Sequence, residues 1–106
     1  MEIKERDCWT PLHIAAINSH IEVVRLLCDH GAHVEARTSR GNWHPGQRPL
    51  HLAAENGHIS IVEELIEVRN AEINGRNGKG EAALWIARRS GKADIVAYLI
   101  SLGGIE

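Results

Sequence analysis

Aromatic residues are scarce in this chain, which has three Trp, one Tyr and no Phe among its 106 residues. A single large hydrophobic core usually recruits more aromatic rings, so this composition favours many small interfaces built from Leu, Ile, Val and Ala. Hydrophobic residues make up 43% of the chain and charged residues 25%, which is ordinary for a globular domain. The length is sufficient for one domain.

Other features are also missing, and each absence excludes a class of protein. No apolar run approaches the roughly 18 residues that a membrane-spanning helix needs, and a formal net charge of -2 gives no global attraction to nucleic acid. Residues 1–7 are mostly charged and lack the apolar stretch of a secretory signal. Cys8 and Cys28 are too few for a multi-bridge framework, so we expect two free thiols in a reducing compartment, the cytoplasm or the nucleus.

A short motif occurs three times along the chain. Thr10–His13 reads Thr-Pro-Leu-His, Arg48–His51 reads Arg-Pro-Leu-His, and Ala82–Trp85 is a degraded copy, Ala-Ala-Leu-Trp. The copies begin 38 and 34 residues apart. An internal period in the thirties is typical of a stack of small helical units rather than of one globular core. Such a stack offers a long open surface, and surfaces of this kind usually bind other proteins.

Each unit is predicted to form two short helices. Thr10 is a suitable N-cap for the first helix, and Pro11 suits its first turn, where the missing N–H has no partner in any case. Gly57 breaks the first helix of the second unit, so that a second helix with apolar residues at helical spacing runs back beside it. Asn70 occupies the place where the other units have a glycine, and a helix C-terminus favours a left-handed residue there.

The chain resembles the ankyrin repeat family over nearly its whole length, from about Asp7 to Ile105. The matching segments are Thr-Pro-Leu-His with the following Ala-Ala, then Gly-His and Val-Val-Arg-Leu-Leu, and the closing Gly-Ala-x-Val turn. The resemblance implies an all-α solenoid of three stacked helix-turn-helix units with protruding hairpin-like loops. It implies one domain over residues 1–106, with repeats at approximately 5–37, 38–76 and 77–106. The family binds protein partners on a concave surface formed by the loop tips and the first helices.

The loop between the first two repeats is longer than its counterpart. The period there exceeds the usual 33 residues by five, which places an insertion at residues 42–46, at the loop tip. Trp43 and His44 are candidates for binding, because an exposed Trp on a loop is a suitable anchor for a partner. The alternative is a tolerated surface insertion, with Trp43 folded back onto the neighbouring helix.

Two further departures from the repeat predict local structure. One extra residue within 67–69, before Asn70, predicts a bulged helix end. In the third copy Arg88 replaces the second Ala that follows the motif, which predicts that this side faces water and that the third repeat acts as a terminal cap. The first repeat instead looks internal. Because the N-terminal face of this repeat resembles one that a neighbouring repeat covers, we expect either a longer array or packing of this face on another molecule, including self-association.

No constellation of residues predicts catalysis. The sequence shows no nucleophile–base pair and no carboxylate pair, and the repeat register explains the Gly-rich segment 74–80 as a loop. The resemblance assigns to His13 and His51 the hydrogen bonds that orient the loops. A zinc site near Cys28 is disfavoured, because Cys28 fills a core position of the repeat and paired Cys spacing is lacking. We therefore expect a non-enzymatic chain with no metal and no cofactor.

The resemblance places partner contacts in the loop just before each motif and at the two residues after Ala-Ala. Basic residues concentrate in the loops and acidic residues on the second helices. This distribution is interpreted first as ordinary solvated charge, and alternatively as a surface that attracts an acidic partner segment. The competing function is a structural spacer or a self-associating segment of a longer array. Asn74 occupies a position that in this family is a target of hydroxylation, or it only stabilises the turn. The predicted partner-binding residues are Trp9, Asn18, Arg40, Trp43, His44, Gln47, Glu55, Asn56, Lys79, Glu81 and Arg89.

Overall fold

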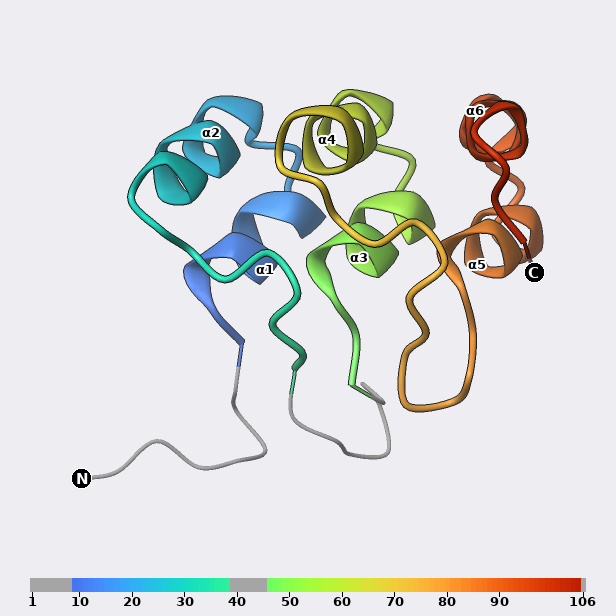
Figure 1. Ribbon diagram of the computed structural model, residues 1–106, viewed down its shortest axis with the longest axis horizontal. Coiled ribbons are helices and arrows are strands. Elements are labelled where there is room, and N and C mark those ends of the chain that lie inside the picture. The colour runs from blue at the N-terminus through green and yellow to red at the C-terminus, as the bar shows by residue number, and fades with distance from the viewer. Residues whose placement is uncertain (1–8, 39–45, 106) are drawn as a thin grey trace.

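The computed structural model describes residues 9–38 and 46–105, and within these ranges the chain is all-α, as predicted. The helices lie in two rows, with α1, α3 and α5 in one and α2, α4 and α6 in the other, and the loops project away from both rows (Figure 1). Neighbouring first helices pack side by side along the stack. The elements are α1 (Pro11–Ile17), α2 (Ile21–Asp29), α3 (Pro49–Glu55), α4 (Ile59–Glu63), the π-helical segment η2 (Glu64–Val68), α5 (Ala83–Arg89) and α6 (Ala93–Ser101).

The core is one continuous cluster of buried side chains that runs through all three repeats between the helices. Small residues let the first helices approach closely, since Ala16, Ala53 and Ala54 are completely buried. The second helices contribute branched aliphatic side chains, among which Val24 and Val62 are equally inaccessible. This arrangement explains how the chain folds with so few aromatic rings.

The motif sets where each first helix begins. Thr10 caps α1 through its hydroxyl, which accepts a hydrogen bond from the backbone N–H of His13 at 3.3 Å, and Pro11 occupies the first turn. In return the backbone N–H of Thr10 donates to Nδ1 of His13 at 3.0 Å. In the second repeat the N–H of Arg48 donates to Nδ1 of His51 at 3.1 Å. The predicted cap at Thr10 is therefore confirmed.

The same histidines connect each first helix to the loop that follows it. Because Nδ1 accepts a backbone N–H, the ring proton must lie on Nε2. Nε2 of His13 donates to the carbonyls of Ala36 at 2.9 Å and Gln47 at 3.1 Å, and Nε2 of His51 donates to the carbonyl of Gly75 at 2.9 Å. Both rings are almost completely buried. The predicted role of these histidines in orienting the loops is confirmed by this geometry.

The end of the second helix pair departs from α-helical geometry where the extra residue lies. Residues Glu64–Val68 form a π-helix, whose wider turn accommodates the one extra residue of this repeat. Asn70 follows in the left-handed conformation, with φ of 60°, at the place where Gly31 has φ of 89°. Both the predicted bulge and the predicted left-handed Asn70 are confirmed.

The π-helix brings a nearly buried carboxylate into contact with two arginines. Glu64, which is 8% exposed, accepts hydrogen bonds from Nε of Arg25 at 3.2 Å and from Nε of Arg69 at 3.0 Å. Arg69 also pairs with Asp29 at 2.9 Å. Because Arg25 and Asp29 belong to α2, this cluster links the first two repeats on the side of the second helices.

The buried histidines make the stability of the fold depend on pH. Burial is the main cause that lowers the pKa of His51 to about 4, and the nearby Arg48 and Arg37 lower it further against the opposing hydrogen bond to Gly75. The unfolded chain takes up this proton below about pH 6.5, whereas the folded chain does so only near pH 4. The free energy of unfolding should therefore fall as the pH drops through this window, by up to about 3 kcal/mol from His51. Urea unfolding across that pH range measures the slope.

Matched variants separate this contribution from that of other groups. A His51→Gln variant should be less stable at neutral pH and should show a smaller loss on acidification. Ser60 is exposed and does not titrate, so Ser60→Ala should keep the wild-type pH dependence. Equal slopes for the wild type and His51→Gln would contradict the assignment of the acid sensitivity to His51.

Candidate protein-binding surface

A chain of polar contacts joins two loops to the C-terminal ends of α3 and α5. Gln47 lies at its centre, where its amide oxygen accepts from Nδ2 of Asn77 and its amide nitrogen donates to Glu55 at 3.5 Å. Asn77 also donates to Glu81 at 3.0 Å, and Glu81 accepts from Arg89 at 2.8 Å. We refer to Gln47, Glu55, Asn77, Glu81 and Arg89 as the loop-base network. It spans the second and third repeats.

The structure places the side chain of Gln47 largely away from solvent. We expected this side chain to be available to a partner, but it is only 6% exposed and its amide is occupied within the loop-base network. Its backbone also closes the base of the loop, because Thr38 N–H donates to Gln47 O at 2.9 Å. Gln47 therefore holds its neighbours in position.

Asn77 belongs to the loop-base network, and the sequence analysis did not single it out. It is 5% exposed, and its Oδ1 accepts the backbone N–H groups of Lys79 at 2.8 Å and Glu81 at 3.0 Å. The side chain thus shapes the tip of the third loop, which leaves Lys79 exposed. An Asn followed by Gly is a typical signal for such a turn, and the segment Asn77-Gly78 contains it.

Glu81 is held ionised at the end of the network. Burial raises the pKa of this carboxyl group, but hydrogen bonds from Asn77, Trp85 and Arg89 and the charge of Arg89 outweigh burial, so the pKa lies below its usual value. Its Oε2 accepts from Nε1 of Trp85 at 3.3 Å as well as from Arg89. Glu81 therefore fixes two large side chains on α5, which are 40% exposed for Trp85 and 43% exposed for the side chain of Arg89.

The other predicted residues in the described part of the chain serve partly as caps and packing groups. Asn18 and Asn56 close the ends of α1 and α3, because their side-chain amides donate to Ile14 O at 3.0 Å and to Leu52 O at 2.8 Å. Both remain exposed at the surface. Trp9 is half-buried, and its ring meets His13 edge-on at 5.9 Å between centroids. Arg40, Trp43 and His44 lie outside the described residues.

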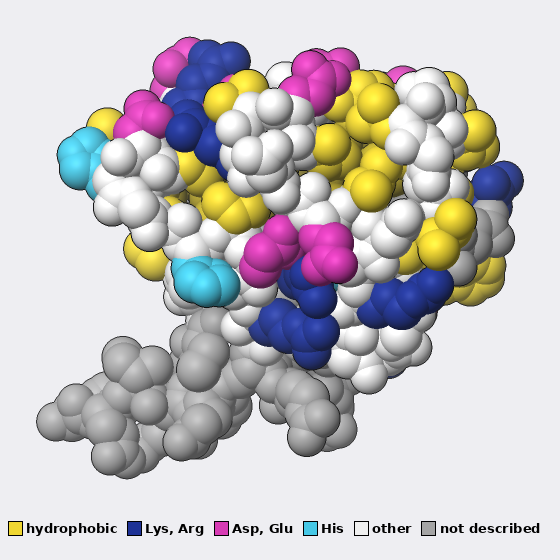
Figure 2. Space-filling view, in the orientation of Figure 1, with side chains coloured by type: hydrophobic (Ala, Val, Ile, Leu, Met, Phe, Trp, Pro, Cys, Tyr) yellow, Lys and Arg dark blue, Asp and Glu magenta, His cyan; other side chains and the backbone are white. Residues whose placement is uncertain are grey.

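The loops carry mixed charge rather than the basic charge that the sequence favoured. Arg48 lies between two carboxylates, Glu35 and Glu72, each at 3.0 Å, and its side chain is 14% exposed. Arg37 donates to the carbonyl of Arg76 at 3.1 Å and so links the second loop to the third. Figure 2 shows acidic and basic side chains next to one another on this face. Lys79 and Arg89 are thus the predicted basic contacts that face solvent.

Asn74 and His30, which lies near Cys28, both form local hydrogen bonds through their side chains. Oδ1 of Asn74 accepts the backbone N–H of Ile105 at 2.9 Å and ties the last turn of the chain to the third loop, so hydroxylation of Asn74 stays a prediction. His30 donates from Nδ1 to Leu26 O at 2.9 Å. Within residues 9–38 and 46–105, no group of three or more His, Cys, Asp or Glu side chains is placed to hold a metal ion. No helix in the described part of the chain is long and apolar enough to cross a membrane.

Stacked helix pairs and loops anchored by the motif histidines define a helical repeat protein. Comparison with known families agrees. A model described as ankyrin repeats, three copies, matches residues 38–106, and the ankyrin repeat model matches residues 7–39. The chain belongs to the ankyrin repeat family.

Individual relatives share only short segments with the chain. Delta-latroinsectotoxin-Lt1a of Latrodectus tredecimguttatus is 48% identical over 42 residues, which cover 40% of this chain and 4% of the toxin. Alpha-latrotoxin-Lt1a of the same species is 39% identical over 41 residues, covering 39% of this chain and 3% of the toxin. Ankyrin repeat domain-containing protein 49 of Bos taurus is 54% identical over 35 residues, covering 33% of this chain and 15% of that protein. The matched segments are therefore small fractions of the relatives.

The pair Arg48 and Gly75 gives a test of how the second loop is anchored. A Cβ at position 75 would lie 2.4 Å from Nη1 of Arg48, whose guanidinium is held by Glu35 and Glu72. Gly75→Ala should therefore displace the guanidinium, lose these ion pairs and reduce stability by about 1–2 kcal/mol. Chemical denaturation measures this change.

The first repeat provides the control for this substitution. There Thr10 takes the place of Arg48 and Ala36 takes the place of Gly75. A smaller side chain therefore faces a residue that has a Cβ. Gly75→Ala should accordingly be nearly harmless in an Arg48→Thr background, so the two substitutions should couple in a double-mutant cycle. Additive effects would show that the contact between Arg48 and Gly75 is unimportant.

Proposed function

We propose that this chain is a non-enzymatic protein-binding module whose partner docks across the C-terminal ends of α3 and α5 and the third loop. The observation that carries the proposal is the loop-base network, in which buried amides hold exposed side chains in place. Asn77 and Gln47 are nearly inaccessible, whereas Glu55, Arg89 and Lys79 face solvent around them. Side chains fixed before binding lose less conformational entropy when a partner arrives.

Trp85 and Arg89 are the proposed anchors of this surface. Both contact the same carboxylate oxygen of Glu81 and lie one turn apart on α5. Trp and Arg are enriched among the residues that dominate binding energy, because each combines a large contact area with specific polar groups. Trp85 was recognisable in the sequence as the residue that replaces the motif histidine, although it was not among the predicted binding positions.

We propose fewer basic contacts for an acidic partner than the sequence predicted. Arg48 is neutralised by two carboxylates, so the acidic partner segment is expected to meet Lys79 and Arg89 instead. We place the module in the reducing cytoplasm or nucleus, in keeping with the free thiol of Cys28. Insertion residues Trp43 and His44 stay predicted contacts.

Binding is tested with a partner recovered on the immobilised chain and then purified. Replacing Trp85 or Arg89 by Ala should weaken its binding by at least about 2 kcal/mol, or about 30-fold in Kd, while the variant stays folded at the assay temperature. Isothermal titration calorimetry and thermal unfolding by circular dichroism provide the two measurements. A matched control is Val68→Ala in η2, which removes an exposed apolar side chain from a second helix.

The competing function makes the opposite prediction. A spacer with no ligand of its own would yield no partner whose affinity depends on Trp85 or Arg89. Equal affinity of the wild type, both variants and Val68→Ala would overturn the proposed surface.

A further inference from the structure

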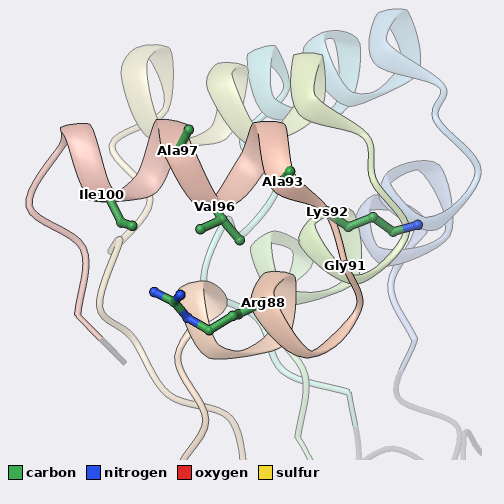
Figure 3. A pocket seen from close by; sticks show the side chains of 7 residues that line it. All are labelled: Arg88, Gly91, Lys92, Ala93, Val96, Ala97 and Ile100. Carbon is green, nitrogen blue, oxygen red and sulfur yellow. The ribbon is translucent and has the colours of Figure 1, made fainter.

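The C-terminal face of the stack is apolar and open. Between α5 and α6 lies a surface groove of about 430 Å³ that Val96, Ala97 and Ile100 line from α6 and Arg88 lines from α5 (Figure 3). Ile100 is 51% exposed. In the second repeat, Ala54 and Val62 hold the positions of Arg88 and Val96, and the next repeat buries both completely. Arg88 itself is exposed, as predicted, whereas the groove beside it is lined mainly by apolar residues.

The N-terminal face is apolar as well. Ile14, Val23 and Leu26 are 49%, 42% and 56% exposed. The residues in register with Ile14 and Val23 in the second repeat are Leu52 and Ile61, which are 2% and 0% exposed because the first repeat covers them. Exposed aliphatic residues in three register positions therefore mark the face that a preceding unit would cover.

Inside the chain, polar pairs join the second helices of neighbouring repeats. Glu64 pairs with Arg25 of the first repeat, and the hydroxyl of Tyr98 donates to Glu67 of the second. Glu64 and Tyr98 are in register, and Leu26 holds the same position on the N-terminal face. Because Leu26 is apolar, a copy that stacks through this position needs no polar partner on the facing surface.

The C-terminal face likewise lacks the polar residues that join neighbouring repeats inside the chain. Ala97 is in register with Arg25, and Ser101 is in register with Glu67. Arg25 and Glu67 are the polar partners in the contacts between repeats inside the chain. Ala97 offers no polar group, and the hydroxyl of Ser101 already donates to Tyr98 O at 2.6 Å. Apolar Leu26 would therefore meet a small apolar residue, with no buried charge left without a partner.

We propose that copies of this chain associate head to tail, with the N-terminal face of one copy stacked on the C-terminal face of the next in the register that joins repeats within the chain. The occupant of the groove between α5 and α6 is thus a second copy, which presents Ile14, Val23 and Leu26. The two proposals are tested with different variants and different measurements, so either proposal can fail alone. A head-to-tail contact uses two different faces and does not close, so it continues the solenoid across chains.

Arg88 is the residue that limits this contact. It stands where the internal repeats have Ala16 and Ala54, and its side chain lies along the groove (Figure 3). A long aliphatic stem can cover apolar surface, but it fills space that an incoming helix uses. Lys92 is less of an obstacle, because its Cδ lies 3.2 Å from where a Cβ of Gly57 would be, which directs the side chain toward the second repeat.

Analytical ultracentrifugation of the whole chain across a concentration series tests the stack. The weight-average mass of the wild type should rise above the monomer mass of 11.7 kDa as concentration increases. Leu26→Glu blocks the N-terminal face and Ile100→Glu blocks the C-terminal face, and both positions are more than half exposed, so folding should persist. Each variant alone should stay monomeric. An equimolar mixture should form dimers, because each variant keeps the face that the other has lost.

Controls and the remaining outcomes decide between arrangements. Ser60→Glu adds the same charge in α4, in register with Glu22 and Asp94, and should associate like the wild type. Arg88→Ala restores the small residue of the internal repeats and should shift association to lower concentration. A wild type that stays monomeric throughout would overturn the proposal. Association of Ile100→Glu alone would also overturn it, since that result means contact between two N-terminal faces.

Discussion

A neutral imidazole held between a helix N-terminus and the next loop is the interaction on which the rest of this structure depends. His13 and His51 accept a backbone N–H at Nδ1 and donate from Nε2 to a loop carbonyl. Only the neutral ring can do both, and burial is the main cause that lowers the pKa of each ring and so keeps it neutral. One side chain thus fixes where the helix starts, which path the loop takes and how far apart successive units lie.

The candidate binding surface follows from this anchoring. With the loop backbones fixed, Gln47 and Asn77 come into contact although 30 residues separate them in the sequence. Both amides are buried, and buried polar groups are stable only when their hydrogen bonds are satisfied. Satisfying them places Glu55, Glu81 and Arg89 at defined positions around the network. The interior of the loops therefore determines the arrangement of the exposed side chains.

Local rules explain which features could be predicted from the sequence. The cap at Thr10, the left-handed Asn70 and the bulge before it each depend on a few neighbouring residues and on comparison between repeats. The burial of Gln47 and the neutralisation of Arg48 depend instead on which loops meet in space. Charge counted along the chain suggested basic loops, because the count does not show that Glu35 and Glu72 lie beside Arg48. Periodicity reveals the scaffold, and the contacts between unequal loops appear only in three dimensions.

In a stack of repeats, unlike in a closed globule, the two end faces correspond to the two sides of the interface that joins neighbouring repeats. Within this chain that interface combines buried aliphatic residues with polar pairs such as Arg25 and Glu64. Burial of aliphatic side chains stabilises stacking in any register. The polar pairs stabilise only the register in which both partners meet, because in other registers a buried charge lacks its partner. The end faces keep the aliphatic residues and lack the polar pairs, which removes the penalty for contact between copies. Arg88, in the place of an alanine, then becomes the main element that opposes it.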